Sequence, residues 1–199
     1  MPRSLLGIVV YSMLFFSRGI PAETLASIGN EEMNAMMRQV HIDYRSIART
    51  GSDGNLQLTV DPKQSFKILK NKISNQYTIA ITYVPKNSKI EDIESQCEIA
   101  MYSAQRRFVS TILSVGLSSY GICEGFDAIG FVRDKKDTIT GIGVMVDMAY
   151  GPTATERKTP FFIKWEKSSS TPALDEDVSR KLQNTKDLDS LYGIQKALR

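Results

Sequence analysis

Few residues in this chain belong to the types that carry metal or nucleophilic chemistry. His41 is the single histidine, and Cys97 and Cys123 are the two cysteines. One histidine and two cysteines 26 positions apart (123 − 97) do not supply the four ligands of an ordinary Cys/His zinc site. A hydrolase built on a Ser–His–Asp or Cys–His pair would need His41, which follows Val40 beside an apolar helical stripe. That position predicts a surface or boundary histidine.

Carboxylates are the other candidates for acid–base chemistry. Glu124 with Asp127, or Asp127 with Asp147, could bring two acids together as glycosidases do. Both aspartates fall on the less apolar faces of predicted strands, where simple solvent exposure competes with a catalytic role. The "GIGVMVDMAYG" stretch lacks the third glycine of a dinucleotide-binding turn, and no nucleophile elbow appears. We therefore predict no catalytic residue, no metal site and no cofactor.

The N-terminal residues have the three-part plan of a secretory signal peptide. Arg3 precedes an uncharged apolar run over residues 5–16, and Pro21 and Ala22 supply a helix breaker and a small residue for cleavage. This run of 12 residues is shorter than the roughly 20 that cross a bilayer as a helix. We expect cleavage after Ala22 and a periplasmic or secreted bacterial protein that touches the membrane only transiently. An uncleaved signal that acts as an anchor is the alternative.

The charge of the chain bears on its partners. The formal net charge is +3, and removal of residues 1–22, with Arg3 and Arg18, lowers it to +1 (3 − 2). Nucleic-acid affinity needs a basic face that neutralises several phosphates, so we predict no nucleic-acid partner. A smaller basic face is expected on one predicted helix, where it is either a docking face for an anionic partner or an ordinary solvated surface. It consists of Lys63, Lys67, Lys70 and Lys72.

Apolar residues at helical spacing predict helices in the first part of the mature chain. An amphipathic helix is expected over residues 23–48, with a break near Gly29. A second helix is predicted over residues 61–74, because Asp61 can cap a helix and Pro62 fits its first position. This second helix is the one that would present the four lysines.

The longest predicted helix covers residues 88–115 and leads into a region of strands. It should place Phe108 against strand residues such as Ile142, Val144 and Val146. An earlier strand is expected over residues 76–84, a hairpin around "RDKKD" over residues 121–150, and a further strand over residues 160–166.

These elements predict an α+β fold. In it, a long amphipathic helix packs on a mostly antiparallel sheet of about four or five strands, flanked by N- and C-terminal helices. The C-terminal helix follows an "SSSTP" linker. The predicted organisation is a signal peptide over residues 1–22, a single α+β domain over 23–170 and a C-terminal helical extension over 171–199.

Two opposing considerations leave the pairing of Cys97 and Cys123 open. An exported protein with two cysteines usually forms a disulfide, because oxidising compartments trap such pairs. A helix between residues 97 and 115, however, would advance by about 27 Å. Bonded cysteines need Cα atoms within roughly 7 Å. The pair can form only if the helix ends early or the return segment runs straight back along it.

Together, these features favour an exported, non-catalytic protein-binding or assembly subunit of the bacterial envelope, such as a component of a secretion or conjugation apparatus. The methionine-rich stretch "EEMNAMMRQV" favours an adaptable surface for protein partners. A periplasmic inhibitor or immunity protein that blocks an enzyme is the alternative, and a cofactor-free enzyme is a third hypothesis. The expected partner is another protein of the cell envelope.

Overall fold

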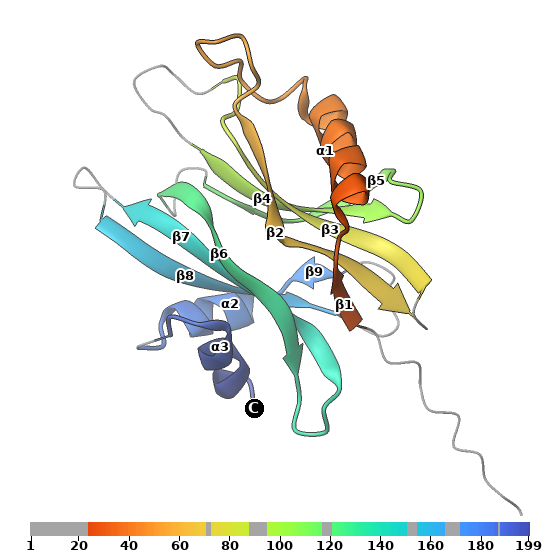
Figure 1. The fold of residues 1–199 in the computed structure, drawn as a ribbon. Coiled ribbons are helices and arrows are strands. Elements are labelled where there is room, and N and C mark those ends of the chain that lie inside the picture. The colour runs from red at the N-terminus through yellow and green to blue at the C-terminus, as the bar shows by residue number, and fades with distance from the viewer. Residues whose placement is uncertain are drawn as a thin grey trace, which may run out of the picture.

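The computed structural model describes two antiparallel sheets with helices on their outer faces (Figure 1). The predicted signal peptide, residues 1–22, lies outside the part of the chain that it describes. None of the helices in that part is both long and apolar enough to cross a membrane. The described residues are 24–70, 73–87, 95–116, 121–150, 155–165, 172–186 and 188–199.

The first sheet has five strands in chain order, each antiparallel to its neighbour. The strands are β1 (Thr24–Ser27), β2 (Leu58–Lys70), β3 (Ile73–Tyr83), β4 (Gln96–Ser103) and β5 (Phe108–Val115). Helix α1 (Asn30–Tyr44) starts directly after Gly29, at the predicted break. The predicted helix over residues 23–48 is wrong before this break, because residues 24–27 form β1. Its buried side chains pack on the outer face of this sheet, and they are Met33, Met36, Val40 and Tyr44.

The second sheet has four strands, again in chain order and antiparallel. The strands are β6 (Ile122–Arg133), β7 (Ile139–Tyr150), β8 (Thr155–Lys164) and β9 (Ala173–Leu174). Helices α2 (Glu176–Gln183) and α3 (Leu191–Ala197) cover its outer face through Leu182 and Ile194. The hairpin predicted around "RDKKD" is confirmed as β6 and β7, and the expected C-terminal helix is divided into two.

The inner faces of the two sheets form the main core. It contains Ile99 and Met101 of β4 together with Val144 and Val146 of β7, all buried. The disulfide between Cys97 of β4 and Cys123 of β6 lies in this core, with the two Cα atoms 5.8 Å apart. The pairing question is thereby answered, because β4 and β5 take the place of the helix predicted after Cys97.

The predicted long helix over residues 88–115 is wrong, and with it the predicted packing of a long helix on one sheet. Residues 96–115 form the β4–β5 hairpin. Cys97, Ile99 and Met101 face the second sheet, whereas Ala100 and Tyr102 face α1. A strand buried on both faces gives a continuous apolar run that periodicity alone cannot distinguish from a helix.

Phe108 is also placed differently from its prediction. Its side chain is 47% exposed at the start of β5, on the edge of the first sheet. The ring packs edge-on against its cross-strand partner Tyr102 and is absent from the inter-sheet core cluster of the described residues, which contains Ile142, Val144 and Val146.

The predicted helix over residues 61–74 is likewise wrong. Asp61 Oδ1 accepts hydrogen bonds from the backbone N–H groups of Lys63 and Gln64, at 2.8 and 3.2 Å, as a helix cap would. The chain nevertheless continues as β2, with an irregularity in pairing between Asp61 and Phe66. The local capping signal is real, but it stabilises a bulge in a strand.

Candidate functional site

The edges of the two sheets differ in how their backbone groups are satisfied. An edge strand presents a row of unpaired N–H and C=O groups, which can recruit another strand unless something covers them. The edges of the first sheet are β1 and β5, and those of the second are β6 and β9, where β9 covers only Ile163 and Lys164 of β8. Three of these four boundaries are short or covered.

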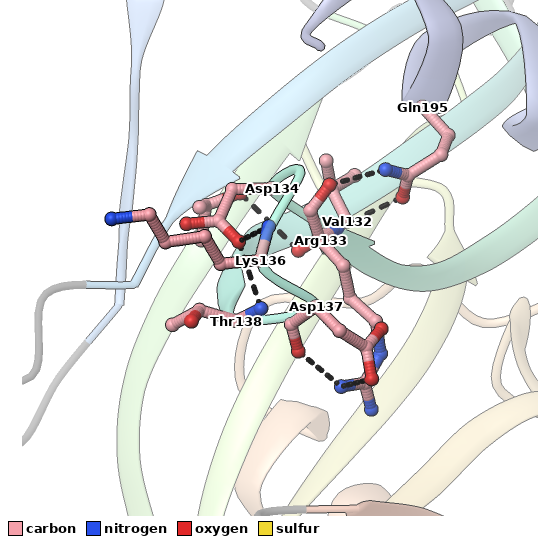
Figure 2. Close-up of polar contacts among 8 residues, drawn as sticks. Val132, Arg133, Asp134, Lys136, Asp137, Thr138 and Gln195 are labelled. Carbon is pink, nitrogen blue, oxygen red and sulfur yellow. Dashed lines mark hydrogen bonds and ion pairs between the residues drawn. The ribbon is translucent and has the colours of Figure 1, made fainter.

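Two glutamine side chains cover the edge of β6. Gln64, from the bulge in β2, accepts from the N–H of Ile129 at 2.9 Å and donates to the carbonyl of Asp127 at 3.0 Å. Gln195 of α3 makes the same pair of contacts to Arg133, accepting from its N–H at 2.8 Å and donating to its carbonyl (Figure 2). Each amide thus imitates a neighbouring strand at one position.

A third contact protects the start of β6. The backbone carbonyl of Ser95 accepts from the N–H of Cys123 at 3.3 Å, and the Ser95 hydroxyl donates to the Cys123 carbonyl. The turn that follows β6 is also closed internally, since Asp134 Oδ1 accepts from the N–H groups of Lys136 and Thr138 (Figure 2). Both ends of the strand are therefore occupied by contacts from its own chain.

Next to the residues that β9 pairs with, α2 and its N-cap cover β8 at Pro160 and Phe162. Phe162 donates its N–H to Ser179 Oγ at 2.9 Å, and its carbonyl accepts from the N–H of Asp175 at 2.9 Å. Two residues earlier, Pro160 has no N–H, and its carbonyl accepts from Gln183 at 3.2 Å. At the far boundary of the first sheet, β1 has only 4 residues. Short strands and edge prolines are common protections against unwanted pairing.

Strand β5 lacks these protections. Its 8 residues, "FVSTILSV", include no charge and no proline. Within the described residues, hydrogen bonds to the backbone of β5 come only from its pairing with β4. Phe108 and Val109 are 47% and 44% exposed, and Thr111 and Ser114 are also exposed. The side of β5 that faces away from β4, called here the β5 edge, is therefore an open edge of the first sheet in the described part of the chain.

The turn before β5 places two arginines at one end of this edge. The N–H of Arg106 donates to the carbonyl of Ser103 at 2.8 Å, and the N–H of Ser103 donates to the carbonyl of Arg107 at 2.9 Å. Arg106 has a φ of 61°, in the left-handed region that glycine and asparagine adopt more readily. Both arginine side chains are exposed, and neither forms an ion pair with any residue in the described ranges.

A buried carboxylate connects β5 to the rest of the first sheet. Glu98 of β4 is 8% exposed and accepts hydrogen bonds from the hydroxyls of Tyr44 and Tyr83 at 2.5 and 2.8 Å. Longer contacts reach it from the hydroxyls of Thr111 and Ser114 on β5, at 3.4 and 3.3 Å. The Glu98 cluster, as we call these five residues, therefore ties α1 and β3 to the strand that carries the open edge.

The Glu98 cluster keeps its tyrosines protonated. Burial, followed by the hydrogen bond and charge of Glu98, raises the pKa of Tyr44 far above its usual range, and burial with the same charge raises that of Tyr83. The pKa of Tyr102 is also raised, by burial and by the carboxylate of Asp43. Because the hydroxyls of Tyr44 and Tyr83 serve as fixed donors to Glu98, the cluster positions β5.

Stability should fall steeply above pH 10 because of these three tyrosines. In the unfolded chain they ionise near pH 10, whereas the folded protein retains their protons, so rising pH favours unfolding. Once the unfolded-state tyrosines are fully ionised, the free energy of unfolding should drop by up to about 4 kcal/mol per pH unit. Urea unfolding at pH 9, 10 and 11 measures this slope. Tyr83→Phe should make it shallower, and an equally steep fall in that variant would contradict the assignment.

The structure brings Asp127 and Asp147 together, but with a cation beside them. Lys158 Nζ lies 2.9 Å from Asp127 Oδ2, and Lys158 is the cross-strand partner of Asp147. Burial and the charge of Asp127 raise the pKa of Asp147, an effect that Lys158 opposes. The pair is thus part of an ion-paired patch on the second sheet. Glu124, the other predicted partner, is exposed on β6.

The remaining predicted site residues are dispersed. His41 lies partly exposed on α1. In the described residues, no group of three or more His, Cys, Asp or Glu side chains is arranged to hold a metal ion. Lys63 and Lys67 lie on β2, and Lys67 forms an ion pair with Glu32 at 2.7 Å. Lys70 ends that strand and Lys72 lies outside the described residues, so no helix gathers the four lysines.

The sequence does not reveal the β5 edge, because it predicts a helix over these residues. The β-branched residues Val109, Thr111, Ile112 and Val115 were the available signal, since such residues favour strands. Comparisons of the sequence with family models and with curated proteins, and of the structure with solved structures, gave no match.

Proposed function

We propose that this chain is an exported, non-catalytic binding protein that captures an extended segment of a partner protein by pairing it with β5. The observation that carries the proposal is the contrast between edges. Side chains from the same chain cover β6 and part of β8, and β1 is short. The backbone of the 8-residue strand β5 forms hydrogen bonds only to β4 in the described part of the chain. Strand addition supplies affinity through backbone hydrogen bonds and specificity through alternate side chains.

Export is supported by two independent features. The disulfide between Cys97 and Cys123 is compatible with an extracellular or periplasmic protein, because such bonds persist in oxidising compartments. The N-terminal sequence has the plan of a signal peptide. In this setting, a small domain that pairs with an extended segment suits the assembly of an envelope structure, in which one subunit presents a strand to the next.

Proline substitution at two neighbouring residues of β5 tests this function. Ser110 and Thr111 pair with Met101 and Ala100 without an irregularity between them, so their N–H groups point to opposite sides of the strand. One proline removes a bond to β4 and should lower the free energy of unfolding by about 1 to 3 kcal/mol. The other removes an N–H at the open edge and should lower the midpoint of thermal unfolding clearly less than the first.

Capture of peptides from a displayed library of random twelve-residue sequences is the measurement. Peptides selected on the unsubstituted protein should lose binding to the more stable proline variant, because proline cannot donate to an added strand. A matched control is Thr24→Pro at the start of β1, on the opposite boundary of the sheet. Selected peptides that bind the more stable β5 variant and the unsubstituted protein equally well would contradict strand addition.

A further inference from the structure

We infer that the segment added to β5 is acidic, with carboxylates that reach Arg106 and Arg107 at the end of the open edge. This inference rests on the proposed function and names the chemistry of the partner. The two guanidinium groups are exposed, lie immediately before β5, and have no ion-pair partner among the described residues. A strand laid along the β5 edge passes beside this turn at one of its ends.

The surrounding hairpin does not neutralise this charge. Between Gln96 and Val115 the single acidic residue is Glu98, and both of its oxygens already accept hydrogen bonds from tyrosine hydroxyls inside the first sheet. A guanidinium presents a planar set of donors that matches a carboxylate. The missing counter-charge at this turn is therefore expected to come from the partner.

The backbone at Arg106 supports a role for its side chain. A φ of 61° is sterically easier for glycine or asparagine than for arginine. Sparsely populated backbone conformations persist where the surrounding structure imposes them, and they concentrate at binding sites. Among the described residues, the other non-glycine residue with a positive φ is Asp137, in the β6–β7 turn. An aspartate adopts that conformation readily. Arg106, in the turn before β5, is less suited to it than an aspartate.

A second copy of this chain is a less suitable occupant than an acidic segment. Strand β5 carries no charged residue, so two copies paired antiparallel along β5 would bring no strand carboxylate to the arginines. The exposed side chains of Phe108 and Val109 offer apolar contact next to the charge. The edge thus fits an extended segment with apolar residues in its centre and acidic residues at its end.

Peptides that differ only in terminal charge test the inference. The tightest peptide from the library selection is synthesised with Asp-Asp, Ser-Ser or Lys-Lys at both ends, so that either direction of pairing brings a substituted end beside the arginines. At low ionic strength, the Asp form should bind the unsubstituted protein about five- to tenfold more tightly than the Ser form, as expected for two exposed ion pairs. The Lys form should bind more weakly than the Ser form.

Charge-removing variants provide the matched comparison. Arg106→Asn with Arg107→Gln keeps a residue that tolerates the turn and should make the Asp and Ser peptides bind equally. Arg180→Gln with Lys181→Gln removes the same charge from exposed positions on α2 and should preserve the difference. Equal binding of the Asp and Ser forms to the unsubstituted protein would overturn this inference while leaving strand addition intact. Self-association that the more stable β5 proline abolishes would instead identify a second copy as the occupant.

Discussion

Replacing Glu98 with alanine should lower the free energy of unfolding by about 3 to 5 kcal/mol, because the substitution leaves two buried hydroxyls without an acceptor. Tyr44 and Tyr83 donate to Glu98 at 2.5 and 2.8 Å, and all three side chains are buried between α1 and the first sheet. Each buried donor left unpaired costs about 1 to 3 kcal/mol. Urea unfolding at pH 7 is the measurement.

The tyrosine variants separate the individual contacts of this cluster. Tyr44→Phe removes one donor to the carboxylate and should lower stability by about 1.5 to 3 kcal/mol, the usual range for a hydrogen bond to a charged group. Combined with Glu98→Ala, it should cost clearly less than the sum of the two single changes, because the contact can be lost only once. Glu124→Ala, at an exposed position of β6, is the control and should change stability by under about 0.5 kcal/mol. Additive effects of the Tyr44 and Glu98 changes would show that the two do not interact.

Removal of the disulfide should have a comparable effect. Cys97→Ala with Cys123→Ala opens a loop with a sequence separation of 26. On the chain-entropy view, closing a loop of this size contributes about 3 to 4 kcal/mol. The midpoint of thermal unfolding should therefore fall by roughly 10 °C. The unsubstituted protein unfolded in the presence of a reductant should behave like the double variant, whereas the double variant should not respond to the reductant.

Thiol titration gives the independent check on this bond. Protein recovered from the exported fraction, then denatured without reduction, should contain no reactive thiol, because both cysteines are paired. Two reactive thiols would contradict the bond and remove one of the two supports for export. Since both cysteines are fully buried in the inter-sheet core, the native protein is expected to resist reduction until it unfolds.

The sequence by itself determined the elements whose signals are local. The "RDKKD" turn between two alternating segments predicted the β6–β7 hairpin, and Asp134 closes that turn by accepting two backbone N–H groups within four residues. The break predicted near Gly29 coincides with the start of α1, and β3 ends at Tyr83, two residues before Pro85. Turn and cap chemistry acts over a few residues, so it can be read without knowledge of distant contacts.

Only the tertiary structure decided the identity of residues 96–115. Their apolar positions satisfy both a helical and an extended pattern, and the choice depends on two surfaces that come from elsewhere in the chain: α1 on one side and β6 and β7 on the other. The same holds for Asp61, whose capping bonds form in a bulge of β2 because β3 provides the pairing partner. Non-local burial outweighs local propensity in such segments.

The candidate site depended even more strongly on tertiary structure. A sheet edge is open where no other part of the chain bonds to its backbone. The edge of β6 is covered by Gln64 and Gln195, which lie more than 60 residues along the chain from the β6 residues they contact. Sequence composition showed Arg106, Arg107 and an uncharged β-branched run, but not which strand would lie at a sheet boundary. The order of strands, and therefore the position of an edge, is settled by long-range pairing and by the packing of two sheets around one core.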